Sequence, residues 1–186
     1  MRDPHSFFLK LIEDGQFRIT DDGHAMLFGE FVVLMPAGVY IKLFELLKKE
    51  LGEKKAWETI GELGEFQMKA AIARYKERFN LQQAQSTKIL DFMMEILNIL
   101  GWGSGTLVVD AKNRAAKITM KNSMLPKKCL AFYGKQSKGA VDYFVLGWMK
   151  ALFEAYFGAP VEAKETLCAA KGDPYCEFVV KAKKKK

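Results

Sequence analysis

Two of the three cysteines in this chain stand close together near its C-terminus, on either side of a turn. Cys168 and Cys176 are eight residues apart, a Gly-Asp-Pro turn at 172–174 lies between them, and Glu165 stands three residues before the first cysteine. Glycine, aspartate and proline favour turns, and a turn between two apolar runs folds a chain back on itself as a hairpin. The sequence therefore predicts a terminal β-hairpin that brings three side chains with metal-binding atoms near one another.

Three interpretations of this cysteine pair stay open. Thiolate sulfur and carboxylate oxygen both bind zinc, so Glu165, Cys168 and Cys176 can supply three corners of a tetrahedral site. Cysteine is also often buried, so the pair can equally be two small core side chains on adjacent strands. A disulfide is the weakest of the three, because the N-terminus shows no secretory signal and we expect a cytoplasmic, reducing location.

Length and charge limit the kind of protein. At 186 residues the chain suits one domain, which we expect to span 1–180 and to be followed by a basic tail at 181–186. Five lysines of that tail account for most of the net charge of +7, and the rest of the chain carries +2. A near-neutral body lacks the basic face of a nucleic-acid-binding domain, so we expect no direct nucleic-acid partner. The longest apolar stretch, 28–41, is interrupted by polar residues, proline and glycine, so we expect no membrane span.

Hydrophobic periodicity predicts an α+β fold in which several long helices pack on an antiparallel sheet. The helix at 53–79 contains Gly61 and Gly64, which indicate either the close approach of another backbone or bound group, or a helix bent around the core. The predicted helices are 9–12, 37–51, 53–79, 82–100 and 138–157. The predicted strands are 17–20, 26–35, 106–110, 115–120, 161–168 and 175–181, with a further candidate at 129–133.

The C-terminal motifs resemble those of a known family. They read Gly147-Trp148, Tyr156-Phe157-Gly158, Glu165-Thr-Leu-Cys168 and Gly172-Asp-Pro-Tyr-Cys176-Glu-Phe178-Val-Val180. This pattern is similar to that of the four-vinyl-reductase (vinyl-4-reductase) domain family, and the similarity is sharp over 140–180. The family includes sensory domains of activators that respond to phenols and other aromatic compounds, and it is more distantly similar to TRAPP core subunits and haem-based nitric-oxide sensors.

The resemblance implies an α+β ligand-binding domain of the TRAPP-core and nitric-oxide-sensor type, often a homodimer, around an apolar cavity. In phenol-sensing members, zinc is held by residues that fall on Glu165, Cys168 and Cys176, and by a helix cysteine that falls on Asp142. This chain therefore replaces one thiolate by a carboxylate, which still binds zinc but as a harder ligand. Cys129 is an outside candidate for this position. Four protein ligands leave no place for water, so the implied zinc is structural.

Three functions follow from the residues and the resemblance. The first is a stand-alone sensor-type domain that binds an apolar or aromatic small molecule, with candidate cavity residues Phe66, Phe92, Met93, Trp102, Phe144 and Trp148. The second is an accessory or catalytic role in reducing a tetrapyrrole vinyl group. Against catalysis, the sequence shows no dinucleotide-binding fingerprint and no polar cluster at catalytic spacing.

The third function is an adaptor that resembles vesicle-tethering subunits. Haem is not expected in any of these cases, because the two histidines, His5 and His24, both lie near the N-terminus and outside the long helices. We expect His5 to be exposed and His24 to lie in a turn.

Overall fold

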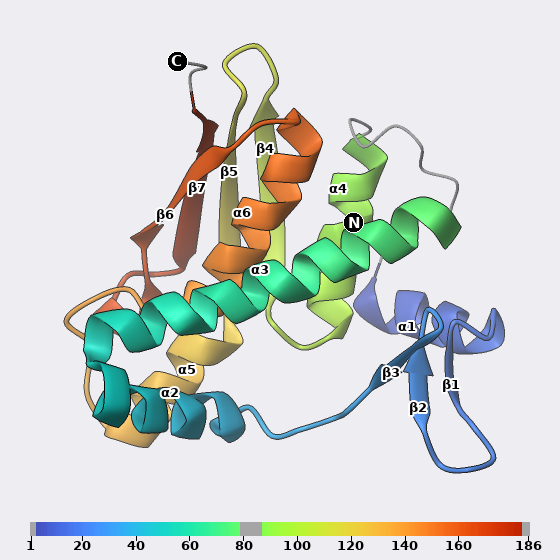
Figure 1. Cartoon of the computed structure of the whole chain (residues 1–186), viewed down its shortest axis with the longest axis horizontal. Helices are drawn as coiled ribbons and strands as arrows, with labels where there is room; N and C mark the ends of the chain where they lie inside the picture. Colours follow the sequence, from blue (N-terminus) through green and yellow to red (C-terminus); the bar gives the residue numbers. More distant parts are fainter. Residues whose placement is uncertain (1–2, 79–86, 184–186) are drawn as a thin grey trace.

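The computed structural model describes residues 3–78 and 87–183. Within these ranges the chain forms six α-helices and two antiparallel sheets (Figure 1), which confirms the predicted α+β class. The helices are α1 (Pro4–Glu13), α2 (Gly38–Leu51), α3 (Glu53–Arg78), α4 (Thr87–Ile99), α5 (Met124–Tyr133) and α6 (Tyr143–Phe157). The strands are β1 (Phe17–Ile19), β2 (Ala25–Leu27), β3 (Glu30–Val32), β4 (Ser104–Asp110), β5 (Ala115–Lys121), β6 (Val161–Leu167) and β7 (Cys176–Ala182).

The larger sheet has the strand order β4-β5-β7-β6 and is antiparallel throughout. Its two predicted hairpins, β4–β5 and β6–β7, meet where Ile118 of β5 pairs with Phe178 of β7. Both side chains are fully buried, and their strands alternate buried and more exposed positions, as expected where one face of a sheet packs on a core. Helix α6 packs against β6 and β7, and α3 crosses α6 on the side away from the sheet (Figure 1).

Three glycines let α3 and α6 cross at close range. A Cβ atom on Gly147 of α6 would overlap the carbonyl of Gly61, and one on Gly64 of α3 would overlap the carbonyl of Phe144. The two helices therefore touch backbone to backbone, and glycine is required because any side chain would force them apart. Of the two explanations for the helix glycines, the structure shows the close approach of another backbone.

The N-terminal region contains the smaller sheet, with strand order β1-β2-β3. A single strand was predicted at 26–35, and this is wrong because Phe28 and Gly29 both adopt positive φ and turn the chain between β2 and β3. After β3, residues 33–37 run as an extended segment to α2 (Figure 1). We call residues 33–37 the strap.

Two other predicted elements differ from the structure. Residues 129–133 belong to α5 and not to a strand, because Gly134 ends this segment in the left-handed conformation of a helix C-terminus. Helix α6 begins at Tyr143 rather than at 138, so Asp142 precedes the helix. The basic tail is shorter than predicted, since Lys181 belongs to β7.

The predicted helix boundaries at 79 and 82, and residues 184–186 of the tail, lie outside the described residues. In the described part of the chain, no helix combines the length and the apolar character that crossing a bilayer requires.

Candidate metal centre and apolar pocket

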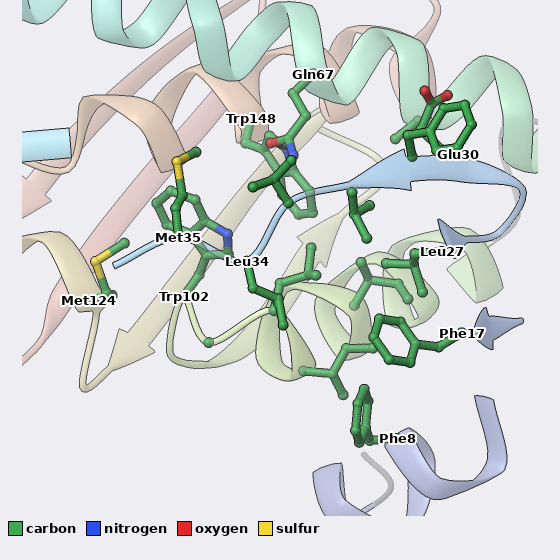
Figure 2. A pocket seen from close by; sticks show the side chains of 18 of the residues that line it. Phe8, Phe17, Leu27, Glu30, Leu34, Met35, Gln67, Trp102, Met124 and Trp148 are labelled. Atoms are coloured by element: carbon green, nitrogen blue, oxygen red, sulfur yellow. Dashed lines mark hydrogen bonds between the residues drawn. The ribbon is translucent and has the colours of Figure 1, made fainter. Parts of the chain in front are cut away.

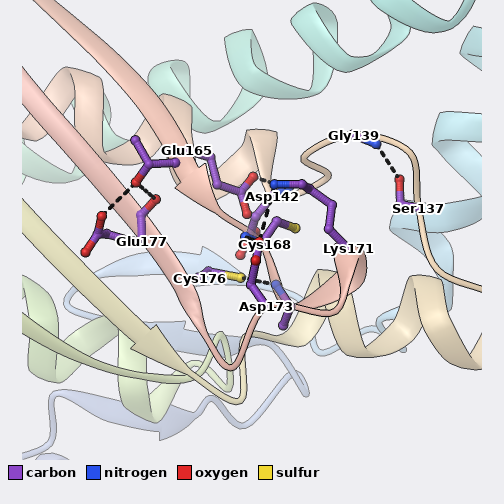
Figure 3. Close-up of polar contacts among 11 residues, drawn as sticks. Ser137, Gly139, Asp142, Glu165, Cys168, Lys171, Asp173, Cys176 and Glu177 are labelled. Carbon is purple, nitrogen blue, oxygen red and sulfur yellow. Dashed lines mark hydrogen bonds and ion pairs between the residues drawn. The ribbon is translucent and has the colours of Figure 1, made fainter.

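The terminal hairpin gathers three metal-binding side chains in one buried place (Figure 3). Glu165 lies on β6, Cys168 follows the end of that strand, and Cys176 begins β7. One carboxylate oxygen and the two sulfur atoms all lie within 4.8 Å of one another. We call these three residues, together with Asp142, the metal centre. The predicted convergence of Glu165, Cys168 and Cys176 is therefore present in the structure.

Backbone amides fix the loop that carries the two thiols. The Cys168 amide donates to Asp173 Oδ2 at 2.7 Å, and the Ala169 amide donates to Cys176 Sγ at 3.4 Å. The bond from the Cys168 amide lowers the pKa of Asp173, so this carboxylate stays ionised and holds the turn. An N–H directed at a sulfur favours the thiolate form, which is the form that binds metal.

The two carboxylates are each held by one oxygen. The Asp142 amide donates to Glu165 Oε2 at 3.0 Å, and the hydroxyl of Ser123 donates to Asp142 Oδ2. The other oxygens, Asp142 Oδ1 and Glu165 Oε1, are buried and have no hydrogen-bond partner among the described residues. Buried polar atoms are nearly always satisfied, so two unsatisfied carboxylate oxygens beside two thiols match the ligand set of a divalent cation.

Burial also shifts the acidity of these groups. It raises the pKa of Asp142 to about 7, and burial followed by the charge of Asp142 raises the pKa of Glu165 to about 10. A hydrogen bond between the two thiols lowers the pKa of Cys168 to about 6 and raises the pKa of Cys176. Negative charge is therefore unfavourable here without a cation to offset it.

Asp142 and Cys129 were the two candidates for a fourth ligand. Asp142 is fully buried and is hydrogen-bonded to Glu165 through its backbone, but its carboxylate lies outside the group of atoms within 4.8 Å. Cys129 lies on α5, also outside that group, and burial raises the pKa of its thiol to about 12. All three cysteines are free thiols, so the structure contains no disulfide between Cys168 and Cys176.

A pocket of about 600 Å³ lies on the other side of α6, partly open to solvent (Figure 2). Its walls come from α1, β3, the strap, α3, the end of α4 and α6, and most of its lining is apolar or aromatic. Side chains that line it include Phe8, Leu27, Tyr40, Ala71, Ile99, Trp102, Met124 and Trp148. Regions far apart in the sequence therefore meet around one space.

The strap forms an exposed rim of this pocket. Val33, Leu34 and Met35 are 81%, 82% and 51% exposed, although they line the pocket. Large apolar side chains left this open to water are unusual when they gather in one place. Sequence reasoning missed the strap because its apolar run resembled the end of a strand, although Gly29 and Pro36 on either side marked it as a separate segment.

Polar groups are few in the pocket. The indole N–H of Trp148 donates to Gln67 Oε1 at 3.2 Å, which orients the Gln67 amide. Arg74 of α3 pairs with Glu30 of β3 at 2.8 Å and ties that strand to the helix. A small number of fixed polar groups in an apolar lining is typical of small-molecule sites.

The six predicted cavity residues fall in three places. Trp102 and Trp148 line the pocket. Phe144 lies behind Trp102 and stacks on it, with ring centres 4.4 Å apart, while Met93 is fully buried on α4. Phe92 contacts Tyr75, whose side chain lines the pocket.

Phe66 does not face inward as its predicted periodicity suggested. It is 75% exposed, and Leu63 beside it is 42% exposed. The buried positions of α3 follow the row Gly64, Met68 and Ala71, which faces α6 and α4, so Phe66 lies on the other side of the helix.

The two histidines lie outside the pocket lining. His5 is exposed on α1, and His24 lies in the connection between β1 and β2, both as predicted.

Residues 126–182 match the vinyl-4-reductase domain family, which confirms the resemblance that the C-terminal motifs predicted. The match contains Asp142, Glu165, Cys168 and Cys176 of the metal centre and most of the larger sheet's second hairpin. No curated protein sequence matches the chain significantly.

Three solved structures share the fold. The phenol-responsive sensory domain of the transcription activator PoxR, solved with phenol, has a TM-score of 0.79 at 15% identity, covering 98% of this chain and 91% of that one. Subunit 3 of the trafficking protein particle complex from Naegleria fowleri, covalently bound to palmitic acid, has a TM-score of 0.55 at 12% identity, covering 80% and 95%. A vinyl-4-reductase family protein from Methanocaldococcus jannaschii has a TM-score of 0.53 at 16% identity, covering 99% and 98%.

Proposed function

We propose that this chain is a sensor-type domain that binds an apolar, aromatic small molecule in the pocket between α3, α4 and the strap. The observation that carries the proposal is the pocket itself, whose volume of about 600 Å³ falls in the range of small-molecule sites. Tyr40, Trp102 and Trp148 supply flat aromatic walls, which favour a planar ring over a flexible chain.

The structural neighbours support this proposal through their ligands. The PoxR sensory domain is described with phenol and the Naegleria subunit with palmitic acid, so this fold accommodates apolar compounds of different shape. The aromatic walls of this pocket lead us to place the ligand in the first of these classes. The pocket is larger than one phenol ring needs, so we expect a compound with two fused or linked rings.

We propose in addition that the metal centre binds zinc in a structural role. Glu165, Cys168 and Cys176 would hold the ion, with Asp142 completing the set through its unsatisfied Oδ1. Zinc accepts this mixture of thiolate and carboxylate ligands, and four protein ligands leave no position for a reactive water. The bound ion would offset the buried negative charge and fasten the terminal hairpin to the start of α6.

A homodimer, which the family resemblance implies, is our proposal for the assembly. Large apolar side chains are exposed at the N-terminal end on β1, β3 and the strap, with Ile19, Phe31 and Leu34 at 61%, 65% and 82%. A second copy that covers this surface would remove them from water. Native mass spectrometry reads the subunit number directly, and a monomer at micromolar concentration would contradict the proposal.

A matched pair of substitutions tests the ligand site. Leu34 and Leu46 are both exposed leucines, but only Leu34 lines the pocket. Leu34→Asp places a charge beside the ligand, so we expect calorimetry with 1-naphthol to show at least a tenfold loss of affinity, about 1.4 kcal/mol. Leu46→Asp, on the outer face of α2, should bind as the unmodified chain does.

Equal binding by both variants, or no binding of 1-naphthol, phenol or palmitic acid by the unmodified chain, would contradict the proposal. A visible absorption band in the purified protein would indicate a bound tetrapyrrole in place of a simple aromatic compound.

A further inference from the structure

The metal centre and the pocket share a wall, and one short segment touches both sides of it. The hydroxyl of Ser123, which is 2% exposed, donates to the Asp142 carboxylate. The next residue, Met124, lines the pocket and donates its amide to the carbonyl of Trp102 at 3.0 Å. The path from the metal centre to the pocket wall therefore consists of one side-chain hydrogen bond, one peptide unit and one backbone hydrogen bond.

A second route joins the same two places through α6. Asp142 directly precedes this helix, and Phe144 in its first turn stacks on Trp102 with ring planes only 5° apart. Tyr40 contacts both of these rings edge-on, at 5.2 Å from Trp102 and 5.3 Å from Phe144. Both routes start at Asp142 and end at Trp102.

The loop that carries Trp102 has little room to move independently of Ser123. A Cβ atom on Gly103 would lie 3.0 Å from the Ser123 Cα and 3.1 Å from the Asn122 carbonyl oxygen. The backbone after Trp102 is thus packed against the backbone before Met124. Close-packed segments of this kind shift together, because neither can move without opening a void or a clash.

We propose that metal binding at the centre strengthens ligand binding in the pocket, with Ser123 as the positioning residue that couples the two sites. The inference rests on the proposed function and adds a mode of regulation to it. A metal ion at the centre fixes the Asp142 carboxylate, which holds Ser123 and the start of α6 and thereby sets Trp102 and Met124 in the pocket wall. Without the ion, two buried carboxylates with unsatisfied oxygens face the thiols, and this wall loosens.

Coupling of this kind is reciprocal, so the ligand should tighten metal binding by the same factor. Zinc and 1-naphthol serve as the two probes in calorimetric titrations of the full chain. We expect 1-naphthol to bind roughly tenfold more tightly to the zinc-loaded protein than to the chelator-treated protein, within the usual range of coupling between sites. Zinc affinity should rise about tenfold when 1-naphthol is present.

Ser123 variants separate positioning from general stability. Ser123→Ala keeps the pocket lining but removes the bond to Asp142, so we expect the zinc-dependent gain in 1-naphthol affinity to fall from about tenfold to below about twofold. Ser123→Thr keeps a hydroxyl and should restore the gain. Ile118→Val is the control, because it removes one buried methyl group from β5 without touching either route, and it should keep the full gain.

Hydrogen exchange tests the coupling without a ligand or a variant. The Met124 amide, bonded to the Trp102 carbonyl, should exchange at least about fivefold more slowly when zinc is added, while amides of β1–β3 keep their rates. Unchanged exchange at Met124, or equal 1-naphthol affinity with and without zinc, would overturn the coupling and leave the proposed function standing. Absence of 1-naphthol, phenol and palmitic acid binding in both states would overturn the proposed function, and exchange at Met124 would then decide the coupling alone.

Discussion

The C-terminal and N-terminal halves of this molecule are built to different standards. Around the metal centre, thiols and carboxylates are buried, backbone amides hold the loop and the Glu165 carboxylate, and α6 crosses α3 with the backbones in contact. Around the rim of the pocket, three-residue strands and the strap leave Phe31, Val33 and Leu34 exposed to water. One half is therefore rigidly specified, while the other is loosely packed.

This difference separates a scaffold from a recognition surface. The segment that matches the vinyl-4-reductase domain, 126–182, contains the metal centre and α6, but of the pocket lining it contains only Trp148. The strap, α1 and β3, which form much of the pocket, lie outside it. Loosely packed segments on a rigid support are where binding specificity is usually found.

The largest effect should come from the helix crossing. Gly147→Ala places a methyl group against the Gly61 carbonyl, so α3 and α6 must separate, and we expect a loss of about 3 kcal/mol or more in the free energy of unfolding. Gly139→Ala is the control, because nothing lies within 4 Å of its Cβ position. Urea denaturation compares the two, and equal stability would show that the C-terminal half is not packed as described.

The next largest effect concerns the metal centre. Cys168→Ser replaces a soft zinc ligand by a hydroxyl, so we expect zinc content to fall from about one ion per chain to near zero, with a looser terminal hairpin. Cys129→Ser should keep its zinc, since this thiol lies outside the group of converging ligand atoms. Elemental analysis of the two purified variants gives the result, and unchanged zinc in Cys168→Ser would remove this residue from the ligand set.

A smaller effect is expected where the two halves are joined across the pocket. Arg74→Ala removes the ion pair with Glu30, whose side chains are 36% and 45% exposed. Exposed pairs contribute little, so the free energy of unfolding should fall by no more than about 1 kcal/mol. A loss above about 2 kcal/mol in urea denaturation would mean that β3 is held far more firmly than its exposure indicates.

The smallest effect should be at the rim. Val33→Ser changes a side chain that is 81% exposed, so we expect the free energy of unfolding to stay within about 0.5 kcal/mol. Thermal unfolding followed by circular dichroism checks this. A clear loss of stability that grows with protein concentration would place Val33 in an interface between copies, in line with the proposed homodimer.

The sequence specified the C-terminal half well because its signals are local. A Gly-Asp-Pro turn fixes the register of β6 and β7, and that register decides that Glu165, Cys168 and Cys176 converge. The error there in element type, a strand at 129–133, arose because a short apolar run suits either structure until Gly134 and tertiary packing decide.

The pocket was harder to predict, since its walls come from separate elements that no local pattern relates. Phe66 was misplaced because α3 packs against α6 through glycines, so that the helix's contact face is marked by missing side chains rather than by large apolar ones. The strap was read as part of a strand, because periodicity does not distinguish a strand from an extended segment outside any sheet. The role of Ser123 depends on a contact 19 residues away in the sequence, and no motif predicts it.

The most direct test is a diffraction experiment at the zinc absorption edge on crystals grown with zinc and 1-naphthol. The proposed function predicts an anomalous peak between the side chains of Glu165, Cys168 and Cys176, within about 2.5 Å of each ligand atom, and electron density for the ring compound against Trp102 and Trp148. No peak among these three residues, together with a pocket that contains only water, would contradict it.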